Sequence, residues 1–164
     1  MANALTISRI ILSVALLALP ALSPIFLAVY ALAGTTDMLD GFLARRAGTV
    51  SELGAKLDSI ADLVLVVVCL MKILPAIDVP MWLWVWVAAI VLVKVANMLS
   101  GFVVEKRLVM PHTTANKVAG FVVFLVPFAI PFVGITAPGA LACAAATFAA
   151  AQEGHLIRTG LTRV

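Results

Sequence analysis

The sequence predicts an all-α, polytopic integral membrane protein with six transmembrane helices. Of its 164 residues, 64% are hydrophobic and only 12% are charged, whereas a soluble domain has about 45–50% apolar and about 25% charged residues. The mean hydropathy is +1.19. A soluble protein of this length cannot bury so much apolar surface, so we expect lipid to be its solvent. No linker or repeat divides the chain, and we expect one domain over residues 1–164.

Six apolar segments approach the length of about 20 residues that a membrane-spanning helix needs. They cover residues 5–21, 24–44, 54–74, 80–104, 116–133 and 137–153. Helix-breaking residues separate consecutive segments, among them Pro20, Pro24, Pro75, Pro80, Gly134 and Pro138. The first segment, with Arg9 ahead of an apolar run, could instead be a cleaved signal peptide. We favour a retained span because apolar segments continue along the whole chain.

Positive charges predict how these helices are oriented. If the N-terminus is cytoplasmic, nine of the eleven Lys and Arg residues lie on the cytoplasmic side: Arg9, Arg45, Arg46, Lys56, Lys106, Arg107, Lys117, Arg158 and Arg163. The positive-inside rule therefore predicts two cytoplasmic termini. The expected location is the plasma membrane of a prokaryotic cell. The formal net charge of +3 does not predict a nucleic-acid partner, because basic and aromatic residues are not interleaved.

Acidic residues are concentrated in one part of the chain. Five of the eight lie within a stretch of 26 residues, and four of these five are aspartates: Asp37, Asp40, Asp58 and Asp62. All four are predicted at the cytoplasmic ends of apolar helices. A carboxylate costs roughly 2.5–3.5 kcal/mol at the centre of a membrane helix, and four together would also repel one another. A bound metal ion is the simplest source of compensating positive charge.

The spacing of these aspartates supports a metal site. The first two are three residues apart and the last two four apart, so each pair occupies one face of its helix. A connection of about nine residues, 45–53, makes the two helices antiparallel neighbours. Oxygen ligands alone favour Mg²⁺, Mn²⁺ or Ca²⁺. The alternative is four solvated helix-end carboxylates. Against it, Gly41, Ala44 and Gly54 share these faces, where small residues let a backbone or a ligand come close.

These residues together read Asp37-x-x-Asp40-Gly41-x-x-Ala44-Arg45, then eight residues, then Gly54-x-x-x-Asp58-x-x-x-Asp62. The pattern resembles the signature of the CDP-alcohol phosphotransferase family at all eight fixed positions and in both spacings. The run from Asn3 to Arg9 is similar to the start of the first span in phosphatidylglycerophosphate synthases and their relatives. The resemblance implies the six-helix fold of that family along essentially the whole chain, a cytoplasmic site and a homodimer.

The resemblance also implies a reaction and roles for these residues. Asp37, Asp40 and Asp58 would hold Mg²⁺ or Mn²⁺, in a site for two metals, and Asp62 would be a further ligand and the general base. The residues that would line the nucleotide pocket are Gly41, Ala44, Arg45 and Gly54. An acceptor hydroxyl would attack the lipid-linked phosphorus of a donor such as CDP-diacylglycerol, and CMP would leave. Such an enzyme acts in phospholipid synthesis, within membrane lipid.

Basic residues are candidates for binding the acceptor alcohol. Lys94 lies inside the predicted fourth span, where a lysine is a functional candidate, unless an acidic neighbour neutralises it or it extends toward water. Arg107, Lys117 and Arg158 could bind the acceptor, or else orient the protein and contact anionic lipid. Together they would suit a phosphorylated acceptor. Glycerol 3-phosphate is the preferred acceptor, and inositol phosphate or another small alcohol is the alternative.

Two further residues and two competing functions complete the interpretation. Asn97 is predicted to join helices rather than to bind a ligand, and Glu153 is predicted to be a charge at a helix end. A divalent-metal transporter is the competing function, but it would need acids near mid-membrane and symmetric halves. A catalytically dead scaffold is a third hypothesis, and the intact set of aspartates argues against it.

Overall fold

The computed structural model describes residues 2–47, 52–105 and 113–159, and the side chains of 6–36, 60–101 and 113–159. Over these ranges the chain is helical and contains no strand, which confirms the predicted all-α class. The helices are α1 (Ala2–Ala18), α2 (Pro24–Ala47), α3 (Glu52–Ile73), α4 (Met81–Glu105), α5 (Thr114–Val133) and α6 (Thr136–Thr159), with a short 3₁₀-helix, η1 (Leu74–Ala76). The chain forms two compact units, Met1–Asp78 and Val79–Val164.

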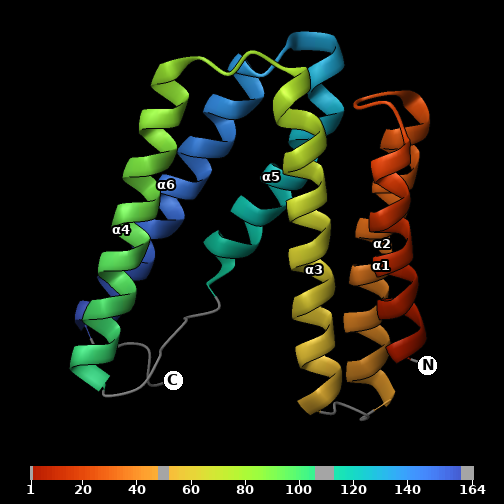
Figure 1. Ribbon diagram of the computed structural model, residues 1–164. Coiled ribbons are helices and arrows are strands. Elements are labelled where there is room, and N and C mark those ends of the chain that lie inside the picture. Colours follow the sequence, from red (N-terminus) through yellow and green to blue (C-terminus); the bar gives the residue numbers. More distant parts are fainter. Residues whose placement is uncertain (1, 48–51, 106–112, 160–164) are drawn as a thin grey trace. The chain divides into compact units, whose positions relative to one another are not determined.

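In the first unit, α1 packs against both α2 and α3 (Figure 1). Ser23 ends the turn before α2, and its hydroxyl accepts a hydrogen bond from the backbone N–H of Phe26 at 3.2 Å. Pro24 follows at the first helical position, where its missing N–H is not needed. The three helices alternate in direction, so the C-terminal end of α2 and the N-terminal end of α3 lie at the same end of this unit.

In the second unit, α6 packs against both α4 and α5, and α4 and α6 lie side by side (Figure 1). Thr113 caps α5 by accepting a hydrogen bond from the backbone N–H of Asn116. α5 ends at Gly134, whose φ of 70° suits glycine. Small residues line the buried face of α6 and let its neighbours approach closely: Gly139, Ala142, Cys143, Ala149, Ala150 and Gly154.

Asn97 of α4 joins α6, as predicted. Its buried amide donates a hydrogen bond to the carbonyl oxygen of Ala150 at 2.7 Å. A Cβ atom added at Gly154 would lie 2.6 Å from Oδ1 of Asn97. The approach of the two helices therefore depends on the absence of a side chain at residue 154.

A Gly154→Ala variant should consequently lose stability. The new methyl group would displace the Asn97 amide from its buried hydrogen bond, at a cost of about 1–3 kcal/mol in the free energy of unfolding. Gly120→Ala is the matched control, because nothing lies within 4 Å of a Cβ atom added there. Thermal unfolding in detergent should show a lower midpoint for the first variant alone. Equal midpoints would contradict this account of the helix contact.

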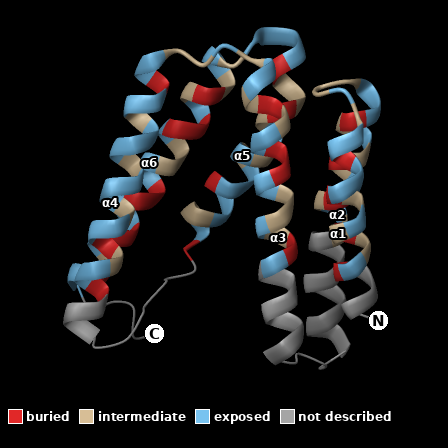
Figure 2. Cartoon of the chain, viewed as in Figure 1, coloured by how far each residue is buried: buried red, intermediate tan, exposed pale blue. Residues whose placement is uncertain are grey.

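Two of the described helices are long and apolar enough to cross a membrane, over Met81–Gly101 and Thr114–Val133. Only 11% and 17% of their most apolar windows are buried, whereas the core helix of a soluble protein is mostly buried. Figure 2 shows α4 with exposed residues along most of its length. Shorter apolar stretches lie at Thr6–Ala18 and Pro24–Thr36 within the described side chains. The six predicted spans correspond to six helices, and their number as spans stays a prediction.

Candidate active site

The motif residues occupy the adjoining ends of α2 and α3. Asp37 and Asp40 lie in the C-terminal half of α2, and Asp58 and Asp62 in the N-terminal half of α3. At a rise of 1.5 Å per residue, Asp37 and Asp62 each lie about 15 Å from the adjoining helix end, and Asp40 and Asp58 about 9–10 Å. Counted from the connection between the two helices, the four residues therefore fall at two matching levels along the chain. A site shared by both helices would need such a placement.

The other predicted pocket residues are placed only by their backbones. Gly41, Ala44 and Arg45 belong to the last turns of α2, and Gly54 belongs to the first turn of α3. Their side chains, like those of Asp37, Asp40 and Asp58, lie outside the described ones. The predicted connection of about nine residues is shorter: α2 ends at Ala47 and α3 begins at Glu52. Arg45 is thus helical rather than part of a turn.

Asp62 is the one predicted site aspartate whose side chain is described, and it pairs with Arg9 of α1. Nη1 of Arg9 donates a hydrogen bond to Oδ1 of Asp62 at 2.8 Å. The arginine side chain is 0% exposed, whereas that of Asp62 is 49% exposed. The carboxylate is therefore held from the protein interior while its surface stays accessible to a ligand.

This ion pair changes the interpretation of the charges. The sequence predicts Arg9 as one of the charges that orient the helices, and a bound metal as the simplest source of positive charge near the aspartates. Arg9 supplies one such charge itself. A signal was present in the sequence, because Thr6, Arg9 and Ser13 share one face of a mainly apolar helix. All three are buried, and a polar stripe inside an apolar helix indicates a functional interior.

A second polar cluster joins the three helices of the other unit. Nζ of Lys94 in α4 lies 3.3 Å from Oε2 of Glu153 in α6 and donates to Oδ1 of Asn116 in α5 at 3.2 Å. Nδ2 of Asn116 donates to the same glutamate oxygen at 3.3 Å. The acidic neighbour that was one alternative explanation for Lys94 is thus present, and it is Glu153. The expectation that Glu153 is a helix-end charge was wrong, because α6 continues to Thr159 and buries this residue against α4.

This cluster predicts an energetic coupling between Lys94 and Glu153. Lys94→Met should lower the free energy of unfolding by about 1–2 kcal/mol, because Glu153, whose side chain is only 11% exposed, loses its cation. Lys94→Met with Glu153→Gln should cost less than the sum of the single variants, by about 0.5–2 kcal/mol. Lys117→Met, an exposed lysine of α5, is the control, with an expected change within about 0.5 kcal/mol. Additive losses in thermal unfolding would contradict the coupling.

The remaining acceptor candidates lie in the second unit or outside the described residues. Lys117 is exposed on α5, Arg158 is exposed in the last turn of α6, and Arg107 lies outside the described residues. Arg158, His155 and Asn97 contribute to a shallow cavity of about 270 Å³ beside Gly154. Within the described ranges, Arg158 is therefore the acceptor candidate that borders a hollow.

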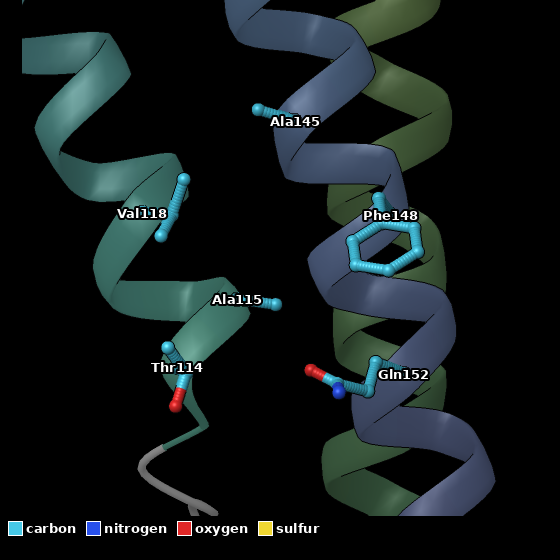
Figure 3. A pocket seen from close by; sticks show the side chains of 6 residues that line it. All are labelled: Thr114, Ala115, Val118, Ala145, Phe148 and Gln152. Atoms are coloured by element: carbon cyan, nitrogen blue, oxygen red, sulfur yellow. The ribbon is translucent and has the colours of Figure 1, made fainter.

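A further hollow of about 290 Å³ lies between α5 and α6 (Figure 3). It is mainly apolar, and its lining residues are Thr114, Ala115, Val118, Ala145, Phe148 and Gln152. None of these is a predicted site residue, and none is charged. We therefore do not place the reaction there.

The donor set of α2 and α3 suits a hard divalent cation. Among the described side chains no three His, Cys, Asp or Glu residues are grouped to hold an ion, and three of the four predicted ligands fall outside that set. The four residues at two matching levels would offer carboxylate oxygens only, which is the chemistry that Mg²⁺ and Mn²⁺ prefer. The side chain of Asp62, in the N-terminal half of α3, is about half exposed, which is compatible with such a role.

The described residues thus form an all-helical protein in which two helices are long and apolar enough to cross a membrane. One accessible carboxylate, that of Asp62, is paired with a buried arginine. The model of the CDP-alcohol phosphatidyltransferase family matches residues 1–152. The chain therefore belongs to the CDP-alcohol phosphatidyltransferase family. The match includes both compact units, and it confirms the resemblance stated from the motif. Members of this family use a CDP-alcohol donor and an alcohol acceptor.

Two curated relatives match over short stretches. The cardiolipin synthase (CMP-forming) of Rattus norvegicus is 58% identical over 41 residues, which are 24% of this chain and 14% of that protein. The CDP-diacylglycerol–serine O-phosphatidyltransferase of Methanocaldococcus jannaschii is 64% identical over 28 residues, 17% of this chain and 14% of that protein. The matches thus span about one seventh of each relative's length. No solved structure matches the chain.

Proposed function

We propose that this protein transfers a phosphatidyl group from a CDP-activated lipid, such as CDP-diacylglycerol, to a small alcohol, with release of CMP. The observation that supports the proposal most strongly is the position of the two aspartate pairs along the chain, one in the C-terminal half of α2 and one in the N-terminal half of α3. Membership of the CDP-alcohol phosphatidyltransferase family supports it. The names of both curated relatives refer to related chemistry.

In the proposed reaction, Asp62 is the general base. The acceptor hydroxyl gives its proton to the Asp62 carboxylate as its oxygen attacks the phosphorus next to the lipid. The bond from that phosphorus to the bridging pyrophosphate oxygen breaks, and this oxygen leaves with CMP. A carboxylate near metal has a low proton affinity, so its value lies mainly in its position. The ion pair with Arg9 supports such a role because it holds the carboxylate in place.

Asp37, Asp40, Asp58 and Asp62 would hold Mg²⁺ or Mn²⁺. Such ions, when bound, would neutralise negative charge on the pyrophosphate and stabilise the oxygens that attack and leave. Arg45 would bind a phosphate of the donor through its planar guanidinium group. Gly41, Ala44 and Gly54, which have little or no side chain, would leave room for the nucleotide.

Glycerol 3-phosphate is our proposed acceptor. The support is the set of basic residues that includes Lys117 and Arg158, since both are exposed and a phosphorylated alcohol is an anion that they would attract. A cytoplasmic site and a homodimer belong to the same proposal. An inositol phosphate would be attracted by the same charges and is the alternative acceptor.

The test is a panel of acceptors offered to the purified protein in detergent with CDP-diacylglycerol and Mg²⁺ or Mn²⁺. CMP release would be measured, and each lipid product would be identified by its mass. We expect CMP release that depends on the acceptor, with phosphatidylglycerophosphate as the main product. CMP release with another alcohol alone would overturn the proposed acceptor. Metal flux through liposomes without CMP release from any mixture would overturn the proposed reaction.

A further inference from the structure

Arg9 is the largest fully buried side chain of the described residues. A buried arginine needs a partner, because an isolated charge away from water is strongly unfavourable. Its partner here is Asp62, at 2.8 Å. The pairing joins a residue of α1 to the residue of α3 on which the proposed reaction depends. Arg9 and Asp62 are 53 residues apart in the sequence, so only the fold reveals their contact.

The surroundings of Arg9 hold it in place. Its carbonyl oxygen accepts a hydrogen bond from the hydroxyl of Ser13 at 2.8 Å. Leu16 continues the same buried face of α1, whereas Ile7, Ile11 and Val14 on the other faces are exposed. The hydrogen bond from Ser13 fixes the backbone of Arg9 within α1, and the buried guanidinium group reaches α3 through the hydrogen bond that it donates to Asp62.

The contrast in exposure suggests a division of roles. Arg9 is wholly enclosed and cannot meet a substrate, whereas half of the Asp62 side chain is accessible. Among the described side chains, the proposed reacting group that Arg9 contacts is the Asp62 carboxylate, so we expect the arginine to act on the reaction through it. A planar guanidinium sets the direction of its hydrogen bonds, which a lysine ammonium, a point charge on a flexible chain, does not.

We propose that Arg9 is a positioning residue that orients the Asp62 carboxylate for proton transfer. This inference rests on the proposed function, in which Asp62 is the base. It differs from a purely structural role, in which the pair would only fasten α1 to α3. If Arg9 positions the base, its loss lowers the rate of the chemical step and leaves donor binding intact.

The first experiment compares Arg9→Lys with Lys72→Met. The lysine keeps the positive charge but lacks the planar guanidinium group. We expect kcat to fall about 10–100-fold, as for other residues that orient a catalytic group. The KM for the CDP-lipid and its directly measured Kd should change less than about threefold. Lys72→Met is the matched control, because Nζ of Lys72 donates to the carbonyl oxygen of Leu17 at 3.1 Å and so also joins α3 to α1. We expect its kcat to be unchanged.

The second experiment places Arg9→Lys in an Asp62→Asn background. If Arg9 acts through the base, the added substitution lowers the residual kcat little further, since the group it positions is already lost. A full additional loss would overturn the proposal, as would a normal kcat in Arg9→Lys. Thermal unfolding shows whether the Arg9→Lys variant folds. If it does not, Arg9→Gln is placed in the Asp62→Asn background instead, and a full additional loss of kcat would again overturn the proposal.

The two proposals fail in different ways. Full turnover by Asp62→Asn would show that Asp62 is not the base and would overturn the proposed mechanism. A strong loss in Asp62→Asn together with a normal kcat in Arg9→Lys would leave the proposed function in place and overturn only the role of Arg9.

Discussion

Asp62→Asn is expected to lower kcat by about 10²–10⁴-fold, the usual contribution of a positioned general base. Asparagine has nearly the same shape, and its carbonyl oxygen can still accept the 2.8 Å hydrogen bond that Arg9 donates. It cannot take a proton from the acceptor hydroxyl. We therefore expect binding of the CDP-lipid to survive within several-fold. CMP release at saturating substrates and a direct measurement of donor binding would check both parts.

Asp78→Asn is the matched control for this substitution. Asp78 lies in the same unit, beyond η1 at the opposite end of α3, and it is exposed. The chemical change is identical, but no proposed reacting group is near in sequence or along the helix. Its kcat should be unchanged. A variant Asp62→Asn with normal turnover would show that another group accepts the proton.

The helical part of the fold could be predicted because two signals in the sequence coincide. Apolar segments mark helix interiors, and Pro24, Pro80 and Gly134 stand where helices begin or end. The largest difference is at the end of α6, which was expected at 153 and is found at Thr159. Hydropathy predicts only where the apolar residues end, whereas the helix continues through the more polar turns after residue 151.

The candidate site could be predicted only as far as local spacing determines it. Two aspartate pairs, three and four residues apart, indicate two helix faces because helical periodicity is local. The partner of Asp62 is 53 residues away, and the partner of Lys94 is 59 away. Such pairs depend on which helix faces pack together. For this reason Arg9 was interpreted by its position relative to the membrane rather than by its contact.

Removal of divalent metal is the second large effect that we expect. Protein treated with a chelator should release CMP at least about 10³-fold more slowly, since metal supplies several kcal/mol of transition-state stabilisation. Adding Mg²⁺ or Mn²⁺ should restore turnover. Arg9 brings a single positive charge to the Asp62 carboxylate, whereas four aspartates would carry four negative charges. Repulsion in the metal-free protein should therefore also lower its thermal unfolding midpoint.

The unfolding midpoint separates a metal site in the protein from a requirement of the substrate. An ion that binds the folded chain raises the midpoint without any CDP-lipid, by mass action. A triple variant with asparagine at Asp37, Asp40 and Asp58 is the control, because it removes three of the four proposed ligands and keeps the Arg9–Asp62 pair. Mn²⁺ should raise the midpoint of the unmodified protein and not that of the variant. If Mn²⁺ raises both equally, or if turnover persists in excess chelator, these aspartates are not the metal ligands that the reaction needs.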